Sequence, residues 1–286
     1  MKLALAAALS TGCLSLTEPP PPDCLKPRLL EELSDPLSPP SDDASPWLAP
    51  DRREILFSSD RGADVRLFNA KRESIDEPFD GPVEIAGLEI PGTTRDPFLE
   101  PDGLTLWFTV QEPMAQEPRI YRAQRAAPRS STFAKAERVE LGDGAHPSMT
   151  GDGLTLYFSR KNGASLSSIW RATRSSTSAQ FGDAVEVTSV RGADLTSGHL
   201  RAPTINYDGN RLLFTYSTSG VEPFGIFESD VLGGEFEPGT PEQDTARTDA
   251  LDSDQDPSFH AGAETFVFAS DRTPGSSDLD IYVACE

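Results

Sequence analysis

The sequence has little positive charge. Only 25 of its 286 residues are lysine or arginine, against 46 aspartates and glutamates, so the formal net charge is −21. Nucleic-acid binding depends on cations that neutralise phosphates, and this composition excludes it. The same charge disfavours unaided docking on an anionic lipid surface. An acidic surface keeps a protein soluble, while basic partners and divalent cations stay open as ligands.

Motifs of several enzyme classes are also missing. The chain contains no Gly-x-Ser-x-Gly nucleophile elbow, no phosphate-binding glycine loop and no Cys-x-x-Cys pair. A propeller peptidase would in addition need a hydrolase domain, for which the repeats described below leave no chain.

The chain lacks a hydrophobic run long enough to span a membrane. Its N-terminal apolar stretch, Leu3 to Leu9, follows Lys2 and precedes Ser-Thr-Gly-Cys at residues 10–13. This order is typical of an export signal and resembles a bacterial lipobox, which implies that residues 1–13 are a signal peptide and that Cys13 is lipidated. An ordinary cleaved signal and a mis-assigned start are the alternatives.

Residues 14–23 would then form a tether. Four consecutive prolines, 19–22, make this segment extended and partly stiff. In the lipoprotein rule an aspartate after the lipidated cysteine retains the protein in the inner membrane. Leu14 occupies that position, so the resemblance implies an outer-membrane anchor, with no other contact to the membrane.

What the chain does contain is a five-fold recurrence of proline followed eleven residues later by phenylalanine. The pairs are Pro46 and Phe57, Pro97 and Phe108, Pro147 and Phe158, Pro203 and Phe214, and Pro257 and Phe268. The prolines lie 50 to 56 residues apart, a period typical of a four-stranded propeller blade with its loops. We therefore expect five repeat units, beginning near residues 45, 96, 146, 202 and 256.

Each unit has the pattern of successive short strands. In three units an Asp-Gly pair, such as Asp102-Gly103, separates two apolar runs and tolerates the positive φ of a hairpin turn. The second run alternates with period two and carries aromatics on both faces, which predicts sheets covered on both sides. A third strand is marked by an aliphatic-aromatic pair: Leu67-Phe68, Ile120-Tyr121, Ile169-Trp170, Ile226-Phe227 and Ile281-Tyr282. Looser segments, Phe133 to Leu141 and Phe181 to Val187, are interpreted as outer strands.

These units resemble a known repeat family. Segments such as DPFLEPDGLTLWFT, HPSMTGDGLTLYFSR and DPSFHAGAETFVFASDR with DIYVA are similar to PD40 repeats, the WD40-like propeller repeats of TolB and its relatives. The resemblance covers residues 44 to 286 and implies an all-β, five-bladed propeller of four-stranded blades, forming a single domain over residues 24–286. The family includes scaffolds, peptidase propellers and carbohydrate-active enzymes, so the resemblance does not choose a function. No room precedes residue 44 for the α/β domain of TolB, so TolB-like partners are not carried over.

Closure of the ring involves both ends of the chain. The last unit supplies three strands, ending at Ile281 to Ala284, and the unassigned apolar positions of Cys24 to Leu33 are expected to supply its fourth. Pairing of the termini would bring Cys24 beside Cys285, and neighbouring cysteines of an exported protein are expected to be oxidised. Two unpaired thiols in flexible tails are the alternative to this disulfide.

Candidate chemistry lies along the channel. The first strand of each propeller blade lines the central channel, and the residue before each proline lies at one level of it: Ser45, Asp96, His146, Ala202 and Asp256. The two carboxylates and the imidazole, Asp96, His146 and Asp256, suit a divalent metal or an acid/base pair acting on a glycan. The structural interpretation is that short polar residues cap the strands or link neighbouring blades by hydrogen bonds.

Other polar residues are weaker candidates. Asp252, Asp254 and Asp256 form an Asp-x-Asp-x-Asp pattern that suits calcium, but without the glycine and glutamate of an EF-hand; the alternative is a solvated acidic loop. The other two histidines, His199 and His260, occupy registers different from that of His146, so a shared ligand set is not expected.

Ser-Asp-Arg recurs at residues 59–61 and 270–272. The resemblance implies that its aspartate accepts backbone donors and that its arginine pairs across blades.

The sequence thus predicts a monomeric, non-enzymatic lipoprotein of the bacterial envelope whose propeller binds a protein or glycan partner, with no cofactor other than calcium under consideration. The alternative is a glycosidase or metal-dependent lyase that uses the channel residues.

Overall fold

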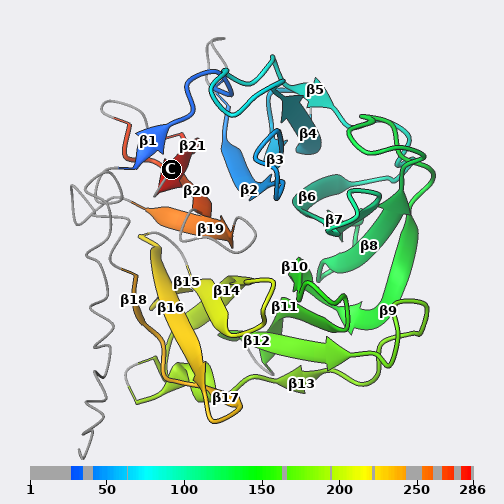
Figure 1. The fold of residues 1–286 in the computed structure, drawn as a ribbon. Coiled ribbons are helices and arrows are strands. Elements are labelled where there is room, and N and C mark those ends of the chain that lie inside the picture. The colour runs from blue at the N-terminus through cyan, green and yellow to red at the C-terminus, as the bar shows by residue number, and fades with distance from the viewer. Residues whose placement is uncertain are drawn as a thin grey trace, which may run out of the picture.

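The computed structural model describes residues 27–34, 41–62, 64–162, 166–193, 195–220, 223–242, 253–259, 266–273 and 278–284. Within these ranges the regular structure is β-strand except for one short 3-10 helix, η1 (Ser189–Arg191). The strands form five antiparallel sheets arranged as a ring around a central axis (Figure 1). The prediction of an all-β, five-bladed propeller is therefore confirmed. In the described part of the chain no helix has the length and apolarity needed to cross a membrane.

The blades follow one another along the chain, and their strands are given from the axis outwards. Blade 1 contains β2 (Asp43–Leu48), β3 (Glu54–Ser59), β4 (Arg66–Lys71) and β5 (Val83–Glu84). Blade 2 contains β6 (Thr93–Leu99), β7 (Thr105–Gln111), β8 (Arg119–Gln124) and β9 (Glu137–Asp143). Blade 3 contains β10 (Ala145–Met149), β11 (Thr155–Asn162), β12 (Leu166–Thr173) and β13 (Val185–Glu186).

Blades 4 and 5 depart slightly from this plan. Blade 4 contains β14 (His199–Ile205), β15 (Arg211–Ser217), β16 (Gly225–Leu232) and β17 (Glu235–Phe236), with β18 (Thr240–Pro241) also paired to β16. Blade 5 contains β19 (Asp254–Phe259), β20 (Phe266–Ser270), β21 (Asp280–Ala284) and, as its outermost strand, β1 (Arg28–Leu29).

The pairing of β1 with β21 closes the ring as predicted. Arg28 lies opposite Val283 and Leu29 lies opposite Tyr282 in an antiparallel register. The first and last strands of the described chain consequently lie side by side in one blade (Figure 1). Leu30 and Leu33, which follow β1, are buried in an apolar cluster with Phe57 of blade 1 and Val283 of blade 5.

A bulge interrupts the innermost strand of every blade. In each pair of first and second strands the register shifts at the residue before the proline and the proline itself. Proline has no N–H to donate to a ladder, and a bulge is one of the few places in a sheet that accepts it. The recurring proline therefore marks the point at which each inner strand bends beside the channel.

The outer strands are shorter than the sequence pattern suggests. The expected strand from Phe133 to Leu141 begins only at Glu137, and the one from Phe181 to Val187 is reduced to β13. Phe133 packs beneath the Arg125 guanidinium, and Phe181 packs against Trp107 with ring centroids 5.9 Å apart. These two aromatics therefore fill the space between blades instead of extending the sheet.

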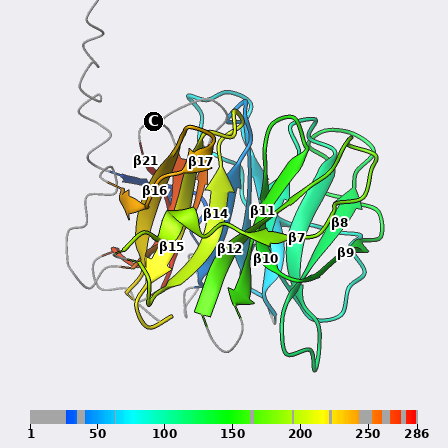
Figure 2. The same cartoon turned by 90° about the horizontal axis from the view of Figure 1, so that it is seen from below.

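The apolar core lies between the blades. The second strands are buried on both faces: every residue of β3 is buried, as is every residue of β7 except the last. This confirms the expectation of sheets covered on both sides. Figure 2 shows the blades from the side, with the inner strands crossing the thickness of the ring. We call the face on which the innermost strands begin the strand-start face.

Candidate functional site

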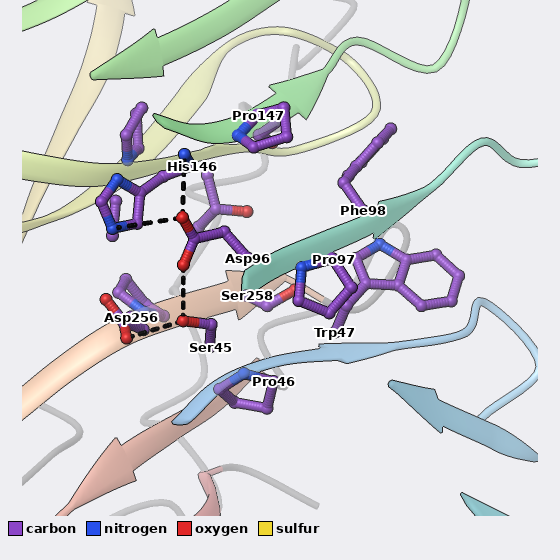
Figure 3. Close-up of a pocket in the computed structure, with 15 residues that line it drawn as sticks. Ser45, Pro46, Trp47, Asp96, Pro97, Phe98, His146, Pro147, Asp256 and Ser258 are labelled. Atoms are coloured by element: carbon purple, nitrogen blue, oxygen red, sulfur yellow. Dashed lines mark hydrogen bonds and ion pairs between the residues drawn. The ribbon is translucent and has the colours of Figure 1, made fainter. Parts of the chain in front are cut away.

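The five residues that precede the channel prolines form one ring at the centre of the propeller. All five have left-handed backbone conformations, with φ of 51° at Ser45, 54° at Asp96, 54° at His146, 45° at Ala202 and 53° at Asp256. With each proline and the residue after it, they line a small cavity of about 40 Å³ (Figure 3). This volume holds one or two water molecules but no sugar ring.

Ser45 links two carboxylates across the ring. Its hydroxyl oxygen lies 2.8 Å from Oδ1 of Asp96 and 2.9 Å from Oδ2 of Asp256. These residues come from blades 1, 2 and 5, and Figure 3 shows both carboxylates directed at the serine. Because a hydroxyl has one proton, Ser45 donates to only one of the two carboxylates at a time. The predicted convergence of Asp96 and Asp256 is present, with the serine between them.

His146 extends this network into blade 3. Its backbone N–H donates to Thr109 Oγ1 at 3.0 Å and to Asp96 Oδ2 at 3.3 Å, while its Nε2 lies 3.7 Å from the same carboxylate oxygen. Its Nδ1 lies 2.7 Å from the Ser159 hydroxyl. Asp96, His146 and Asp256 therefore meet as the register predicted, and every one of them takes part in hydrogen bonds between blades.

The electrostatics of this ring favour an ionised Asp96. Burial alone would raise the pKa of this carboxyl, and among the effects that lower this pKa the charge of His146 is the largest. Hydrogen bonds from Thr109 and Ser45 and the charge of Arg95 act in the same direction, so that the pKa of Asp96 lies below its usual value. Within the described residues, no group of three or more His, Cys, Asp or Glu side chains is arranged to hold a metal ion.

A second level of the channel lies one residue nearer the strand-start face. It consists of Ala44, Arg95, Ala145, Arg201 and Gln255, all of which line a cavity of about 450 Å³. Sequence reasoning missed the two arginines, although they occupy the position directly before two of the predicted channel residues. The repeat register could have located them, because the residue before each channel residue also faces the channel.

A neighbouring cavity of about 550 Å³ shares Arg201 and His146 with the first. It adds Arg160, Lys161 and His199 from blades 3 and 4. Burial lowers the pKa of the His199 imidazole, and the charges of Arg201, Arg191 and Lys161 lower it further. Burial is the larger cause, and the three cationic side chains near this imidazole add a locally positive charge to a chain whose net charge is strongly negative.

The candidate calcium residues have separate contacts. Asp254 is buried and accepts hydrogen bonds from Arg272 and Ser270, each at 2.7 Å from its Oδ1. Asp256 belongs to the channel ring through Ser45. Asp252 lies outside the described residues, as do His260, Cys13, Cys24 and Cys285, so the calcium site, the lipidation site and the disulfide stay predictions.

Both Ser-Asp-Arg arginines form an ion pair within their own blade. The predicted contact across blades is a hydrogen bond instead: Arg61 donates to the carbonyl of Leu33, in the segment that follows β1 of blade 5, at 2.8 Å. Arg61 Nη2 lies 2.8 Å from each carboxylate oxygen of Asp43, which belongs to the inner strand of the same blade. Arg272 and Asp254 repeat this contact in blade 5. The arginine lies over the aromatic rings of the second and third strands, which directs it inward along its own sheet. Asp60 and Asp271 accept backbone N–H groups as expected.

A second set of arginines escaped the sequence analysis. Arg72, Arg125 and Arg174 follow the third strands of blades 1 to 3, and the Nε of each donates to a carbonyl in the first hairpin turn of its blade, at 2.6 to 2.7 Å. Each also lies over a phenylalanine that precedes the outer strand. Arg125 in addition pairs with Glu54 of blade 1 through two contacts of 2.7 Å, with both side chains almost fully buried.

Comparison with known proteins supports the fold. No family model matches the chain, and no curated protein matches it. The putative TolB of Agrobacterium tumefaciens is 17% identical over 84% of this chain and 75% of that chain, with a TM-score of 0.52. The α-L-arabinofuranosidase of Lactobacillus brevis is 14% identical over 90% of this chain and 94% of that chain, with a TM-score of 0.60.

A thermostable family-43 glycoside hydrolase is 14% identical over 88% of this chain and 91% of that chain, with a TM-score of 0.56. At these identities the likeness concerns the fold alone. The chain therefore has a TolB-like propeller architecture, which propeller glycosidases share.

Proposed function

We propose that this chain is a non-enzymatic scaffold of the bacterial envelope, built from TolB-like PD40 repeats, that binds a protein or glycan partner on its strand-start face. This proposal rests on the observation that the two levels of the channel differ: one holds carboxylates in hydrogen bonds between blades, and the other holds arginines beside larger cavities. The carboxylates of Asp96 and Asp256 are engaged by Ser45 in links between blades. The larger cavities open where the second level offers arginine side chains.

Capture of the partner tests this function. The tagged full-length protein is cross-linked in intact envelopes and purified, and the captured species are compared for the wild type, Arg201→Glu and Arg138→Glu. Arg201 lines both cavities, whereas Arg138 lies on the exposed outer strand β9. We expect a partner that is lost with Arg201→Glu and retained with Arg138→Glu. Equal capture by all three proteins, or none, contradicts a scaffold that works through this face.

A carbohydrate-active enzyme is the second candidate, because two carboxylates and an imidazole do converge in a fold that family-43 hydrolases and arabinofuranosidases share. Against it, the Ser45 hydroxyl lies between the two carboxylates, at 2.8 and 2.9 Å from their oxygens, in the place where a glycosidase holds its substrate. Release of sugar from arabinan or aryl glycosides that disappears in Asp96→Asn and Asp256→Asn would establish the enzyme. Turnover equal to that of buffer removes it.

We further propose export and lipid anchoring through Cys13, with the propeller held at the outer membrane by residues 14–23. Mass spectrometry of the mature N-terminus is expected to show a diacylglyceryl adduct on Cys13. Cys13→Ser is expected to move the protein from the membrane to the soluble fraction. An unmodified mature N-terminus without Cys13 contradicts the anchor.

A disulfide between Cys24 and Cys285 belongs to the same proposal. The pairing of Arg28 with Val283 brings together strands only a few residues away in sequence from the two cysteines. Denatured, unreduced protein is expected to show no free thiol at either position, and a peptide containing both cysteines should appear on proteolysis. Two alkylated thiols under the same conditions contradict it.

A further inference from the structure

We call the cavity at the second level of the channel the channel mouth; two of its arginines form no ion pair with any of the described residues. Arg95 on β6 and Arg201 on β14 line the same cavity of about 450 Å³. Arg201 lies over the Phe224 ring, with 5.5 Å between guanidinium carbon and ring centroid, and Arg95 influences Asp96 only through its charge. Within the described residues, neither guanidinium forms a hydrogen bond or an ion pair. Each therefore presents unused N–H donors to the cavity.

The acidic side chains of the same cavity are already engaged. Asp60 accepts the backbone N–H of Asp42 at 3.0 Å, and Asp42 accepts that of Leu279 at 3.0 Å. Asp96 and Asp256 share the Ser45 hydroxyl. Each aspartate of this cavity thus has at least one hydrogen-bonding contact, whereas the two guanidinium groups have none within the described residues.

The adjoining cavity also contains cationic side chains. It shares Arg201 and adds Arg160, Lys161 and His199. Lys161 is paired with Glu117 at 2.6 Å, and Arg160 donates to the Asp143 carbonyl at 2.7 Å, so among the described residues Arg201 is the guanidinium of this cavity that has no hydrogen-bonded partner. Arg201 stands where the two cavities meet, so a ligand bound there reaches both.

We propose that the mouth of the channel binds a sugar that carries a carboxylate, with Arg95 and Arg201 as the residues that recognise the acid group. Guanidinium matches a carboxylate with paired, charge-assisted hydrogen bonds. The cavities are concave and of small-molecule size, and the amides of Gln111 and Gln255 and the hydroxyls of Thr93 and Thr109 suit sugar hydroxyls. A folded partner would instead need a broad surface. The inference rests on the proposed binding function and names its ligand class.

Matched sugars test this inference. Binding of D-glucuronate and D-galacturonate to the full-length protein is measured by calorimetry and ligand-observed NMR, with glucose and galactose as neutral counterparts. We expect binding of the acids and none of the neutral sugars at the same concentration. Arg95→Gln and Arg201→Gln should each weaken acid binding about 10- to 100-fold, as expected for a lost charge-assisted hydrogen bond. Arg138→Gln on the outer strand should leave binding unchanged.

Three outcomes overturn the inference: no binding of either acid, equal binding of acidic and neutral sugars, or binding that both channel variants retain. An acidic peptide that binds while the sugar acids do not also overturns it, and assigns the arginines to a protein partner. Any of these results leaves the scaffold intact if envelope capture through the strand-start face succeeds. If uronates bind but no protein is captured from the envelopes, the proposal of a protein partner is refuted while the uronate site stands.

Discussion

At the residue in front of each channel proline the backbone adopts the left-handed conformation, which costs non-glycine residues of order 1 kcal/mol or more. Aspartate and histidine, which occupy three of the five positions, tolerate it better than most residues. The five-fold recurrence shows that the conformation belongs to the bulge of the repeat. The bulges direct five side chains toward one another at the centre of the ring. These side chains differ from blade to blade, and the polar ones form the hydrogen-bond network around Ser45.

Removal of the Ser45 hydroxyl should weaken the ring. In Ser45→Ala the carboxylates of Asp96 and Asp256 lose their shared donor, so we expect the free energy of unfolding to fall by about 1–3 kcal/mol. Urea denaturation measures the change. Ser178→Ala, at an exposed loop hydroxyl, is the control and should change stability by less than about 0.5 kcal/mol. Equal stability of the two variants would mean that the bridge contributes nothing.

Asp43 gives the protein a pH dependence of definite sign. Burial raises its pKa to about 6, against the opposing hydrogen bonds from Ser59 and Arg61. The native state then binds more protons than the unfolded chain between about pH 4 and pH 6. The stability due to this group is therefore present below pH 4 and lost as the pH rises through 6.

The measurement is urea denaturation of the wild type and Asp43→Asn from pH 3.5 to 7. The free energy of unfolding of the wild type, relative to that of the variant, should fall by up to about 3 kcal/mol over this range. A difference that stays constant or grows with pH would show that Asp43 titrates normally or lower, as its pairing with Arg61 alone would dictate.

At the scale of the element, each of the first three blades combines its sheet with an arginine that binds the hairpin turn and covers a phenylalanine. This unit explains why Phe133 and Phe181 do not continue the outer strands. In blade 2 the same arginine also joins the neighbouring blade, because Glu54 of β3 reaches it across the interface. Arg174 is less closely paired, at 3.7 Å from Glu100.

Removing one partner of the Arg125–Glu54 pair should lower the free energy of unfolding strongly, whereas replacing both partners with apolar residues should lower it little. Arg125→Met leaves a buried carboxylate without its counter-charge, and we expect a loss of about 3–5 kcal/mol in the free energy of unfolding. The double variant Arg125→Met with Glu54→Leu should recover most of this loss. Arg138→Met, which breaks the exposed pair with Glu140, is the control and should cost less than about 1 kcal/mol. A double variant as unstable as the single one would contradict this account.

At the scale of the whole molecule, the ring is closed by chain segments from opposite ends of the sequence. Each blade covers its faces by stacking on its neighbours, so the join between blades 5 and 1 is needed as much as any other. Leu33 lies at this join, buried with Phe57 and Val283. The segment that contains β1 and Leu33 thereby adds packing as well as backbone pairing.

Leu33→Ala should therefore act on the closure of the ring. Loss of a fully buried leucine side chain is expected to reduce the free energy of unfolding by about 2–5 kcal/mol. Amide exchange should also show the earliest loss of protection in β21, which pairs with β1. Leu232→Ala, at an exposed leucine of β16, should be neutral in both measurements. Similar behaviour of the two variants would show that the terminal segment does not hold the ring.

The sequence by itself determined the five repeat units, the strands at their centres and the residues that meet in the channel. It left open whether five or six sheets close the ring, and the structure shows five. These features repeat locally: a proline, a turn and an aliphatic-aromatic pair recur in every unit, and strand periodicity places each side chain on a known face. The convergence of Asp96, His146 and Asp256 followed from the register of the repeat in a propeller. The terminal strand followed from the last unit, which supplies only three strands of its own.

Only the tertiary structure decided which partner each polar side chain takes. Ser45 between two carboxylates, Arg125 reaching Glu54, and Arg95 beside Arg201 in one cavity all depend on distances between segments about 50 residues or more apart. The physical reason is that strand geometry repeats every two residues and is encoded locally. Long charged side chains select among several acceptors according to how closely the blades pack.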